Sequence, residues 1–522
     1  MVASSSWGFG LLFVVVVLLR PSSQLRRGYR SSSQSIKETI RYKESSSCVL
    51  IPSDHDVFFN TDQELNRDIS CLAVHVLSLQ SDLKSSTGAV RGDDRKNGLR
   101  VLDAFTASGI RAIRYYNEVP SVSHVTLNDL DAASIQNAEE NLILNEIPGS
   151  CFELVEGGAD VVMREFRENQ ISFDVIDLDP FGSAAPYLDS AVSCLNDGGM
   201  LCINSMLDAV SQPNECYDKY GSIPFGKNKP SYFHELSLRV LLNLVACCAS
   251  RHGRYIKPVL SLTVDHYIRA FVRVFECDSG SNTQQVLLFK PPNKHQQQQQ
   301  RAFLYQAQDT PEFHLQPVNQ PTIQCITEAV QRGINFEVTG PIWSGPLHDH
   351  AWIKQVEALL TPVSSITKKN NGMANEEVAA QENAKALQVL LDASTESVAT
   401  PLSYKLVPDM QRLAQVKHPP RLLPMLALLR NSGFVGTKVQ RAKGSFKTDA
   451  PLTHVVRLMR AWDQLKWQER QERDPACVIP ENVARFVPGV QLNATLPEAL
   501  LREEQHWAAA RGRGGAAPQR KL

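Results

Sequence analysis

Apolar residues between positions 99 and 204 fall into short runs, and stretches with helical periodicity separate most of these runs. Short runs rich in Val, Ile and Leu are typical of strands that are buried on both faces. Strands that alternate with helices predict a parallel sheet with helices on both faces, which is a doubly wound α/β fold. The predicted strands are residues 99–103, 124–130, 152–156, 173–178 and 199–204.

The ends of these strands carry the candidate ligand groups, because ligands bind such sheets beyond the carboxyl ends of the strands. Asp103 ends the first strand, and the small residues 107–109 let the backbone approach a ligand. Asp129 ends the second strand, where a carboxylate can accept both hydroxyls of an adenosine ribose. The loop at 157–160 offers a place for an adenine ring. The pattern G-x-G-x-x-G is absent, which argues against a pyrophosphate cofactor. For any single acid, a helix N-cap is the ordinary alternative.

The strand at 173–178 runs directly into Asp179, Pro180, Phe181 and Gly182, and this ending is the most specific feature of the chain. A carboxylate, a carbonyl turned outward by the proline and an aromatic face suit a planar base with an exocyclic amine. Such an amine is a poor nucleophile, so an enzyme must orient it and accept its protons. The expected methyl donor is S-adenosylmethionine, which needs no metal. An ordinary strand-end turn is the alternative.

Further motifs follow these in a fixed order along the chain. They are Phe58-Phe59-Asn60, Asn66-Arg67-Asp68, residues 103–111, Asn128-Asp129, Asp179–Gly182, residues 216–221, His234-Glu235 with Arg239, and residues 264–269, 340–349 and 447–451. Over about residues 55–480 the chain resembles the tRNA guanosine N2-dimethyltransferases, which modify position 26 of tRNA. The resemblance implies a class I S-adenosylmethionine-dependent methyltransferase with a Rossmann-like doubly wound sheet. The resemblance also implies that a smaller α+β C-terminal domain, which binds tRNA, follows the methyltransferase domain.

The resemblance also implies roles for individual residues. Asp179 is then the catalytic acid-base group, next to Pro180, while Phe58 and Phe181 sandwich the flipped guanine, since stacking offsets the cost of extruding a base. Core packing is the alternative for either ring. Arg67 pairs with the methionyl carboxylate, because a guanidinium suits a planar anion, and a surface salt bridge is its alternative. The expected contacts of S-adenosylmethionine are Arg67, Asp103, Arg111, Asp129, Ala159 and Asp160.

Several positions depart from the family pattern. Family members commonly carry paired cysteines before the motif at 340–349, but residues 303–316 contain none, and the eleven cysteines form no C-x-x-C pair. We therefore expect no zinc site and no other metal, and we expect Cys247 and Cys248 to be core thiols on an apolar helix. The family acid before Ala159 is a glycine here, and Asp160 is expected to take over its contact with adenine. The role of Asp208 stays open.

Composition and charge fit a two-domain soluble enzyme. The chain has 522 residues and 43% hydrophobic content, enough for large cores. Lys and Arg total 54 against 55 for Asp and Glu, so net charge does not indicate a nucleic-acid partner and any basic surface must be local. The candidate basic segments are 417–421, 438–447 and 511–521. A solvated face is the alternative for the first two. The third is expected to be disordered and to add nonspecific attraction to phosphates.

The predicted organisation has five parts. These are a presequence at 1–45, a catalytic domain at 46–280, a linker with a glutamine run at 281–305, a tRNA-binding domain at 306–480 and a disordered tail at 481–522. The first part combines an apolar stretch with Ser and Arg, which favours import into a mitochondrion or other organelle. A membrane anchor or a nuclear enzyme are the alternatives. We expect a monomer without stable membrane association in its mature form.

Three other functions remain open on the sequence alone. An N-methyltransferase can act on another amine, such as a ribosomal RNA guanine or a protein glutamine. An NAD-dependent oxidoreductase is a different class, which the missing glycine pattern disfavours. A catalytically silent RNA-binding module is the last alternative.

Overall fold

The computed structural model describes most of the chain between residues 39 and 480. The described ranges are 39–53, 57–80, 98–206, 213–224, 230–264, 266–277, 301–308, 311–318, 324–360, 402–439 and 442–474, with a few isolated positions between 386 and 480. The predicted presequence before residue 39, the glutamine run, the tail and Asp208 lie outside these ranges.

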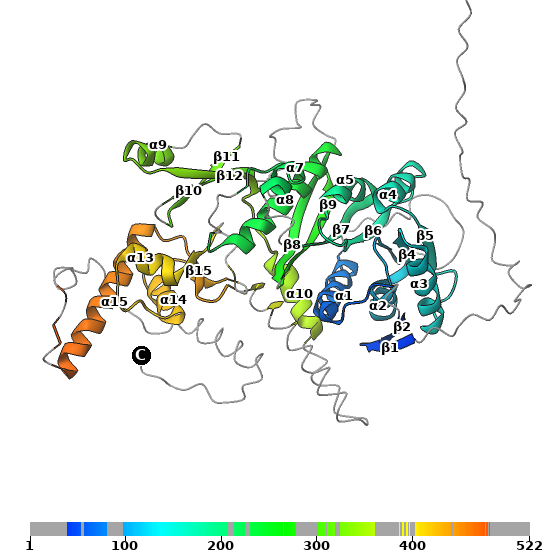
Figure 1. Cartoon of the computed structure of the whole chain (residues 1–522), viewed down its shortest axis with the longest axis horizontal. Coiled ribbons are helices and arrows are strands. Elements are labelled where there is room, and N and C mark those ends of the chain that lie inside the picture. The colour runs from blue at the N-terminus through cyan, green and yellow to red at the C-terminus, as the bar shows by residue number, and fades with distance from the viewer. Residues whose placement is uncertain are drawn as a thin grey trace, which may run out of the picture.

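A seven-stranded sheet forms the centre of the molecule, in the order β5-β4-β3-β6-β7-β9-β8 (Figure 1). The strands β5, β4, β3, β6 and β7 are parallel, whereas β9 is antiparallel to both β7 and β8. This confirms the predicted doubly wound sheet. The strands are β3 (Leu99–Asp103), β4 (Val122–Asp129), β5 (Phe152–Glu156), β6 (Phe173–Leu178), β7 (Leu195–Met206), β8 (Arg254–Val264) and β9 (Tyr267–Glu276).

Helices cover both faces of the sheet, so successive strand side chains enter different cores. Val175 belongs to the core under one set of helices and Ile176 to the core under the other, which explains why apolar residues occur on both faces of the strand. The first set is α1 (Glu64–Ser78), α2 (Ile110–Glu118), α3 (Ala132–Leu144) and α10 (His350–Leu360). The second set is α4 (Ala159–Glu168), α5 (Leu188–Cys194) and α8 (Phe233–Arg251). Short helices are η1 (Thr61–Gln63), η2 (Ala185–Tyr187) and α7 (Pro213–Asp218).

Helix α8 is the longest apolar helix of the central core. Among the described residues it is the one helix whose length and composition would allow a membrane crossing, and 78% of that stretch is buried inside this protein. Cys248 is buried on α8 and Cys247 is partly buried there, and burial raises the pKa of both thiols, as the interpretation as core cysteines requires.

The folded part of the chain begins at residue 39 at the latest, earlier than the predicted boundary at 46. The strands β1 (Thr39–Glu44) and β2 (Ser47–Pro52) form an antiparallel hairpin. The hairpin is fixed to α3, because the amide of Leu50 donates to the side chain of Asn141 at 2.7 Å.

The region after the sheet differs from the single second domain predicted for 306–480. A small antiparallel sheet contains β11 (Phe313–Pro317), β10 (Arg301–Ala307) and β12 (Phe336–Trp343), and α9 (Gln324–Gln331) lies between β11 and β12 in sequence. Its residues Leu304, Ile342 and Trp343 belong to the same core as α8. This part therefore packs with the catalytic sheet, and β10 begins inside the predicted linker.

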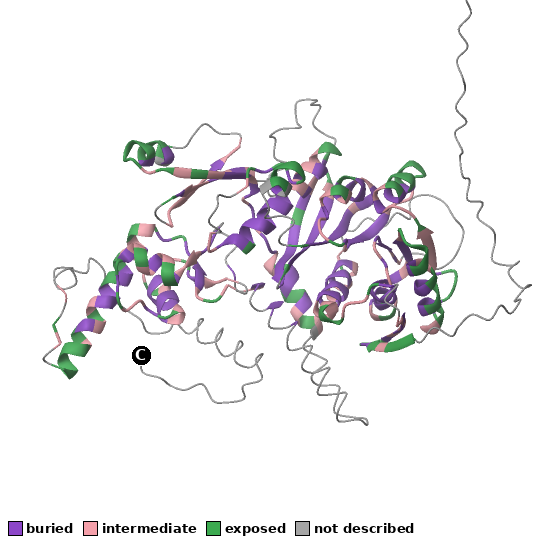
Figure 2. Cartoon of the chain, viewed as in Figure 1, coloured by how far each residue is buried: buried purple, intermediate pink, exposed green. Residues whose placement is uncertain are grey.

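A third core belongs to residues 404–474 alone (Figure 1, yellow to orange). Most described residues of the central strands are buried, whereas the last helix ends in exposed residues (Figure 2). The elements of this module are β13 (Tyr404–Lys405), η3 (Leu406–Met410), α13 (Gln411–Ala414), α14 (Leu422–Asn431), β14 (Thr437–Lys438), β15 (Ser445–Lys447) and α15 (Leu452–Arg473).

Candidate functional site

The segment after β6 presents one acid and one aromatic ring at the carboxyl edge of the sheet. Asp179 follows the last residue of β6, Pro180 is buried, and Phe181 is 93% exposed. Gly182 has a φ of +100°, a left-handed conformation that favours glycine, and its carbonyl accepts from the amide of Met206 at 2.8 Å. The loop is therefore anchored to β7 while the ring of Phe181 points into solvent.

Two side chains hold the carboxylate of Asp179. The amide of Asn204, near the end of β7, donates to Oδ1 at 2.6 Å. Nη2 of Arg111, in the first turn of α2, donates to Oδ2 and forms an ion pair with it. The side chain of Asp179 keeps 23% of its surface exposed, so a substrate can still reach it. We did not predict Asn204, because an asparagine in a strand carries no local signal of function.

Arg111 is itself held by a second, fully buried carboxylate. Asp177 lies 3.6 Å from Nη1 of Arg111, accepts from Arg269 at 2.6 and 2.9 Å, and accepts from the hydroxyl of Tyr115 at 2.5 Å. Burial raises the pKa of Asp177, but Arg111 and Arg269 outweigh it and hold the pKa below its ordinary value. Arg111 thus contacts both the buried, charged carboxylate of Asp177 and the partly exposed carboxylate of Asp179.

Asp103, at the end of β3, is a buried acid with an unused acceptor. Its Oδ2 accepts from Thr106 at 3.1 Å, while Oδ1 has no hydrogen-bond partner among the described residues. Burial raises the pKa of Asp103 to about 7, although Arg111 opposes the shift. Asn128 Oδ1, near the end of β4, is buried without a partner in the same way. Both atoms can accept hydrogen bonds from a ligand at this edge.

Asp129, at the end of β4, shapes the turn that follows β3. Its two oxygens accept from the amides of Ala107 at 2.8 Å and Asp131 at 3.1 Å. Ala107 has a φ of +44°, and Gly109 has a φ of +81° with its Cα so close to α3 that a Cβ would lie 3.2 Å from that of Ala138. A carboxylate oxygen has further lone pairs, so these bonds leave Asp129 able to accept from ribose hydroxyls.

The remaining predicted residues lie on three other segments. Ala159 is buried as the first residue of α4, and Asp160 follows it, paired with Arg164 at 2.9 Å on an exposed face. Phe58 is 65% exposed in the segment before η1, so it does not take part in the core. Its pairing with Phe181 around a base stays a prediction.

Arg67 already has a carboxylate partner within the chain. It is buried, and its guanidinium binds Glu44 through Nε at 2.6 Å and Nη2 at 2.5 Å. Glu44 also accepts from Arg114 at 2.7 Å. The ion pair between Arg67 and Glu44 is buried, so it is not the surface salt bridge that was the alternative. The predicted contact of Arg67 with a methionyl carboxylate stays a prediction.

The predicted basic segment at 438–447 includes one lysine that does not face solvent. Lys447 is 1% exposed, and its ammonium lies 2.8 Å from Glu235 and 2.6 Å from Glu396. Its charge is therefore unavailable to tRNA phosphates, and this part of the prediction is wrong.

The chain is similar to known proteins over most of its length. A sequence model described as N2,N2-dimethylguanosine tRNA methyltransferase matches residues 37–460. A Mus musculus protein named tRNA (guanine(26)-N(2))-dimethyltransferase is 29% identical over 483 residues, which cover 83% of this chain and 69% of the mouse protein. An Arabidopsis thaliana protein, tRNA (guanine(26)-N(2))-dimethyltransferase 2, is 32% identical over 380 residues, 70% of this chain and 59% of its own. The solved structure of Trm1 from Pyrococcus horikoshii with S-adenosyl-L-methionine covers 80% of this chain and 98% of its own, with a TM-score of 0.62 and 24% identity, which shows the shared fold.

Proposed function

This protein belongs to the N2,N2-dimethylguanosine tRNA methyltransferase family, and we propose from this that Asp179 is the residue that acts on the guanine amine. The protein is a tRNA guanine-N2 methyltransferase that uses S-adenosylmethionine to methylate the exocyclic N2 of guanosine 26, giving N2-methyl- and N2,N2-dimethylguanosine. One observation carries the proposed role: Asp179 is held at the strand edge by Asn204 and Arg111 while part of its carboxylate stays exposed.

The residues at this edge supply what the amine needs. Asp179 accepts hydrogen bonds from N2, which turns the amine and its lone pair toward the methyl donor, and it takes the proton that N2 loses. Asn204 and Arg111 keep the carboxylate from rotating. Phe181, exposed beside Asp179, provides a flat face on which an extruded guanine stacks. The chemistry thus depends on orientation and on one positioned base.

The strand ends also fit S-adenosylmethionine, whose sulfonium charge activates the methyl group. Its amino-acid ammonium needs acceptors, and Asp103 offers a buried carboxylate oxygen without a partner. Asp129, at the end of β4, accepts from the ribose hydroxyls in this proposal, and Ala159 and Asp160 begin the helix that follows the next strand. The close packing of Gly109 against Ala138 of α3 fixes the backbone of the turn after β3.

The decisive experiment is mass spectrometry of tRNA nucleosides after incubation of the purified protein with labelled S-adenosylmethionine and undermodified tRNA. We expect labelled N2-methylated guanosine with the wild type. Asp179→Asn keeps the shape of the side chain and should lower the rate about 10²- to 10⁴-fold, as for loss of a general base. Asp189→Asn, at an exposed acid of α5 paired with Arg251, is the matched control. Wild-type rates in Asp179→Asn would refute the assignment, and labelling of protein or ribosomal RNA instead of tRNA would refute the substrate.

The place of action is a separate proposal, which rests on the Arg- and Ser-rich composition of residues 1–45. We propose import into a mitochondrion or another organelle, where the enzyme acts as a monomer without stable membrane association. A fluorescent protein fused behind residues 1–45 should then collect in organelles. Nuclear or membrane fluorescence would contradict this, and sedimentation of the purified protein tests the monomer.

A further inference from the structure

The motif at residues 216–221 contains a buried tyrosine that the mechanism above does not use. Tyr220 is 1% exposed, and it belongs to the core that also contains α5 and α8. Gly221, which follows it, has a φ of +60°, and its amide donates to the carbonyl of Tyr217 at 3.1 Å. The turn after α7 therefore places one tyrosine in the interior of the catalytic domain.

The residues that follow Tyr220 are bonded to the small sheet. The hydroxyl of Ser222 donates to the carbonyl of Pro341 at 2.8 Å. Ile223 forms an antiparallel bridge with Gly340 of β12, through hydrogen bonds of 2.7 and 3.0 Å. Tyr220 is thus held by the core around its ring and by β12 through its neighbours, so its hydroxyl is presented from a rigid support.

The hydroxyl of Tyr220 contacts two serines beside the candidate active site. Its oxygen lies 2.8 Å from Oγ of Ser183 and 3.0 Å from Oγ of Ser205. Ser183 lies in residues 179–184, between β6 and η2, which we call the Phe181 loop. Ser205 is fully buried next to Asn204 on β7. One side chain therefore touches both the Phe181 loop and the strand end from which Asn204 holds the catalytic acid.

The partners of these hydroxyls show where each proton points. The carbonyl of Gly182 only accepts, so Ser205 donates to it, at 3.3 Å, and therefore accepts from Tyr220. The proton of Tyr220 is then used, so Tyr220 accepts from Ser183. The amide of Ala184 also donates to Oγ of Ser205, at 3.4 Å. This chain of hydroxyls begins and ends on the Phe181 loop, so it ties the loop to Tyr220 and β7.

We propose that Tyr220 is a positioning residue for methyl transfer, because its hydroxyl fixes the Phe181 loop against β7. The ring of Phe181 is 93% exposed, so its place depends on how firmly its loop is held. This ring sets the plane of the stacked guanine, and a small displacement of the reacting amine from the methyl donor lowers the rate steeply. The inference rests on the proposed function, since it requires a guanine that stacks on Phe181.

The test is Tyr220→Phe in the full-length protein, which removes the hydroxyl and keeps the ring. We measure single-turnover methylation of tRNA at saturating tRNA and S-adenosylmethionine. The rate should fall about tenfold, because loss of one neutral hydrogen bond changes an equilibrium by about 2- to 12-fold and misplacement of the guanine adds to this. The Kd of S-adenosylmethionine should stay the same, since Tyr220 contacts the loop that holds the base.

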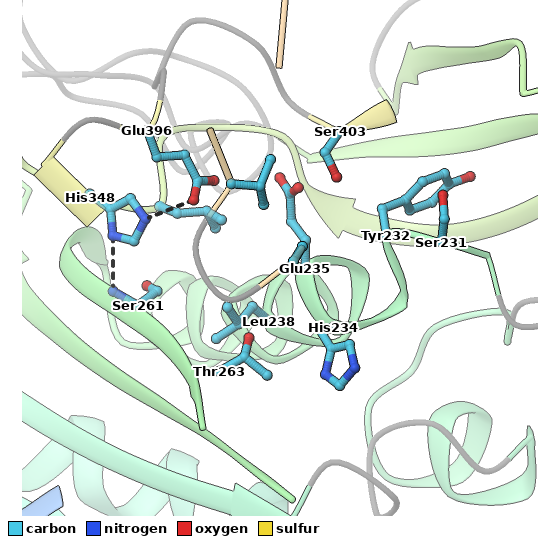
Figure 3. Close-up of a pocket in the computed structure, with 13 residues that line it drawn as sticks. Ser231, Tyr232, His234, Glu235, Leu238, Ser261, Thr263, His348, Glu396 and Ser403 are labelled. Carbon is cyan, nitrogen blue, oxygen red and sulfur yellow. Dashed lines mark hydrogen bonds and ion pairs between the residues drawn. The ribbon is translucent and has the colours of Figure 1, made fainter. Parts of the chain in front are cut away.

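Tyr232→Phe is the matched control. Tyr232 is also buried, at 6% exposed, and its hydroxyl donates to Gln306. Figure 3 shows Tyr232 beside Ser231 at a different place, a pocket that α8 helps to line. Both variants thus lose one buried hydroxyl with a hydrogen bond, but only Tyr220→Phe releases the Phe181 loop. Tyr232→Phe should keep the wild-type rate.

A double-mutant cycle with Ser205→Ala separates positioning from stability. Ser205→Ala breaks the same chain at its next link, so its rate should also fall. The double variant should lose little more than the weaker single variant, because both changes release one loop. A merely structural role would lower the melting temperatures of the variants and leave their rates unchanged at temperatures where they stay folded.

The outcomes distinguish the role of Tyr220 from the proposed function. A wild-type rate in Tyr220→Phe, an equal loss in Tyr232→Phe, or losses that multiply in the double variant would overturn the inference. A weaker Kd of S-adenosylmethionine would do the same, because the whole strand edge would then have moved. Inactivity of the wild type on undermodified tRNA would instead overturn the proposed function. Should Tyr220→Phe fail to fold, Ser183→Ala removes the first link of the chain, and an unchanged rate there would refute the inference.

Discussion

Replacing Asn204 with aspartate tests how the catalytic carboxylate is held. In the wild type, Nδ2 of Asn204 donates to Oδ1 of Asp179 at 2.6 Å, and Asn204 is 7% exposed. Asn204→Asp puts a second carboxylate at this short distance, where two negative charges cannot both be accommodated easily. The two acids then share one proton over a range of pH, and Asp179 is no longer a free acceptor.

The size of the effect follows from two separate losses. A hydrogen bond to a charged group contributes about 1.5–3 kcal/mol, so losing the donor alone lowers kcat roughly 10- to 150-fold. Partial exposure of Asp179 places the expected loss at the lower end, because water can replace the donor. The shared proton adds a pH dependence, because the pair of carboxylates in Asn204→Asp loses that proton as the pH rises.

The assay is single-turnover methylation of tRNA between about pH 6 and pH 9 for the wild type, Asn204→Asp and Asn204→Leu. Leucine has a similar volume but no donor and no charge, so its rate should fall by a similar factor at every pH. The ratio of the aspartate rate to the leucine rate should therefore rise as the pH rises and the shared proton leaves. A ratio that stays constant across this range would show that residue 204 does not touch the ionisation of Asp179.

Three further results are expected. Phe181→Ala should lower kcat/KM for tRNA roughly 5- to 150-fold through lost stacking of about 1–3 kcal/mol, while the melting temperature stays the same because the ring is 93% exposed; an unchanged kcat/KM would remove Phe181 from the site. Asp103 has its pKa raised from 3.8 to about 7, so the folded protein binds an extra proton in that window and its stability falls as pH rises through it. Asp103→Asn should abolish this fall, so its melting temperature should rise relative to that of the wild type between about pH 4 and pH 7, and parallel curves would contradict this. Glu44→Ala leaves Arg67 and Arg114 buried without this carboxylate and should cost about 3–5 kcal/mol in urea denaturation; a loss below about 1 kcal/mol would show that water replaces the carboxylate.

The sequence alone was sufficient for the order of the central elements. Strands β3 to β6 were predicted close to their observed bounds, because strands buried on both faces are rich in Val, Ile and Leu. The acids at their ends were recognisable for the same reason: Asp103, Asp129 and Asp179 directly follow or end such runs. The Asp-Pro-Phe-Gly ending also needed no tertiary information, since its four residues are consecutive.

The domain boundaries were harder to predict from the sequence. The apolar strands β10 and β12 look like the start of a new domain when they are considered along the chain, but they pack against α8 and share its core. The hairpin at 39–52 follows a leader-like composition and still packs on α3. Periodicity indicates that a segment is buried; it does not indicate which surface buries it.

Only the tertiary structure decided which groups surround the candidate catalytic acid. Asn204 and Arg111 lie 25 and 68 positions from Asp179, and Asp177 meets Arg269 across 92 positions. A charged or amide side chain in the sequence carries no mark of its partner, because the partner is set by strand register and by how each helix packs on the sheet. Local sequence therefore determined that acids lie at the ends of the strands. Long-range packing determined that Asp179 is held by its partners, that Arg67 is paired with a carboxylate and that Lys447 is buried.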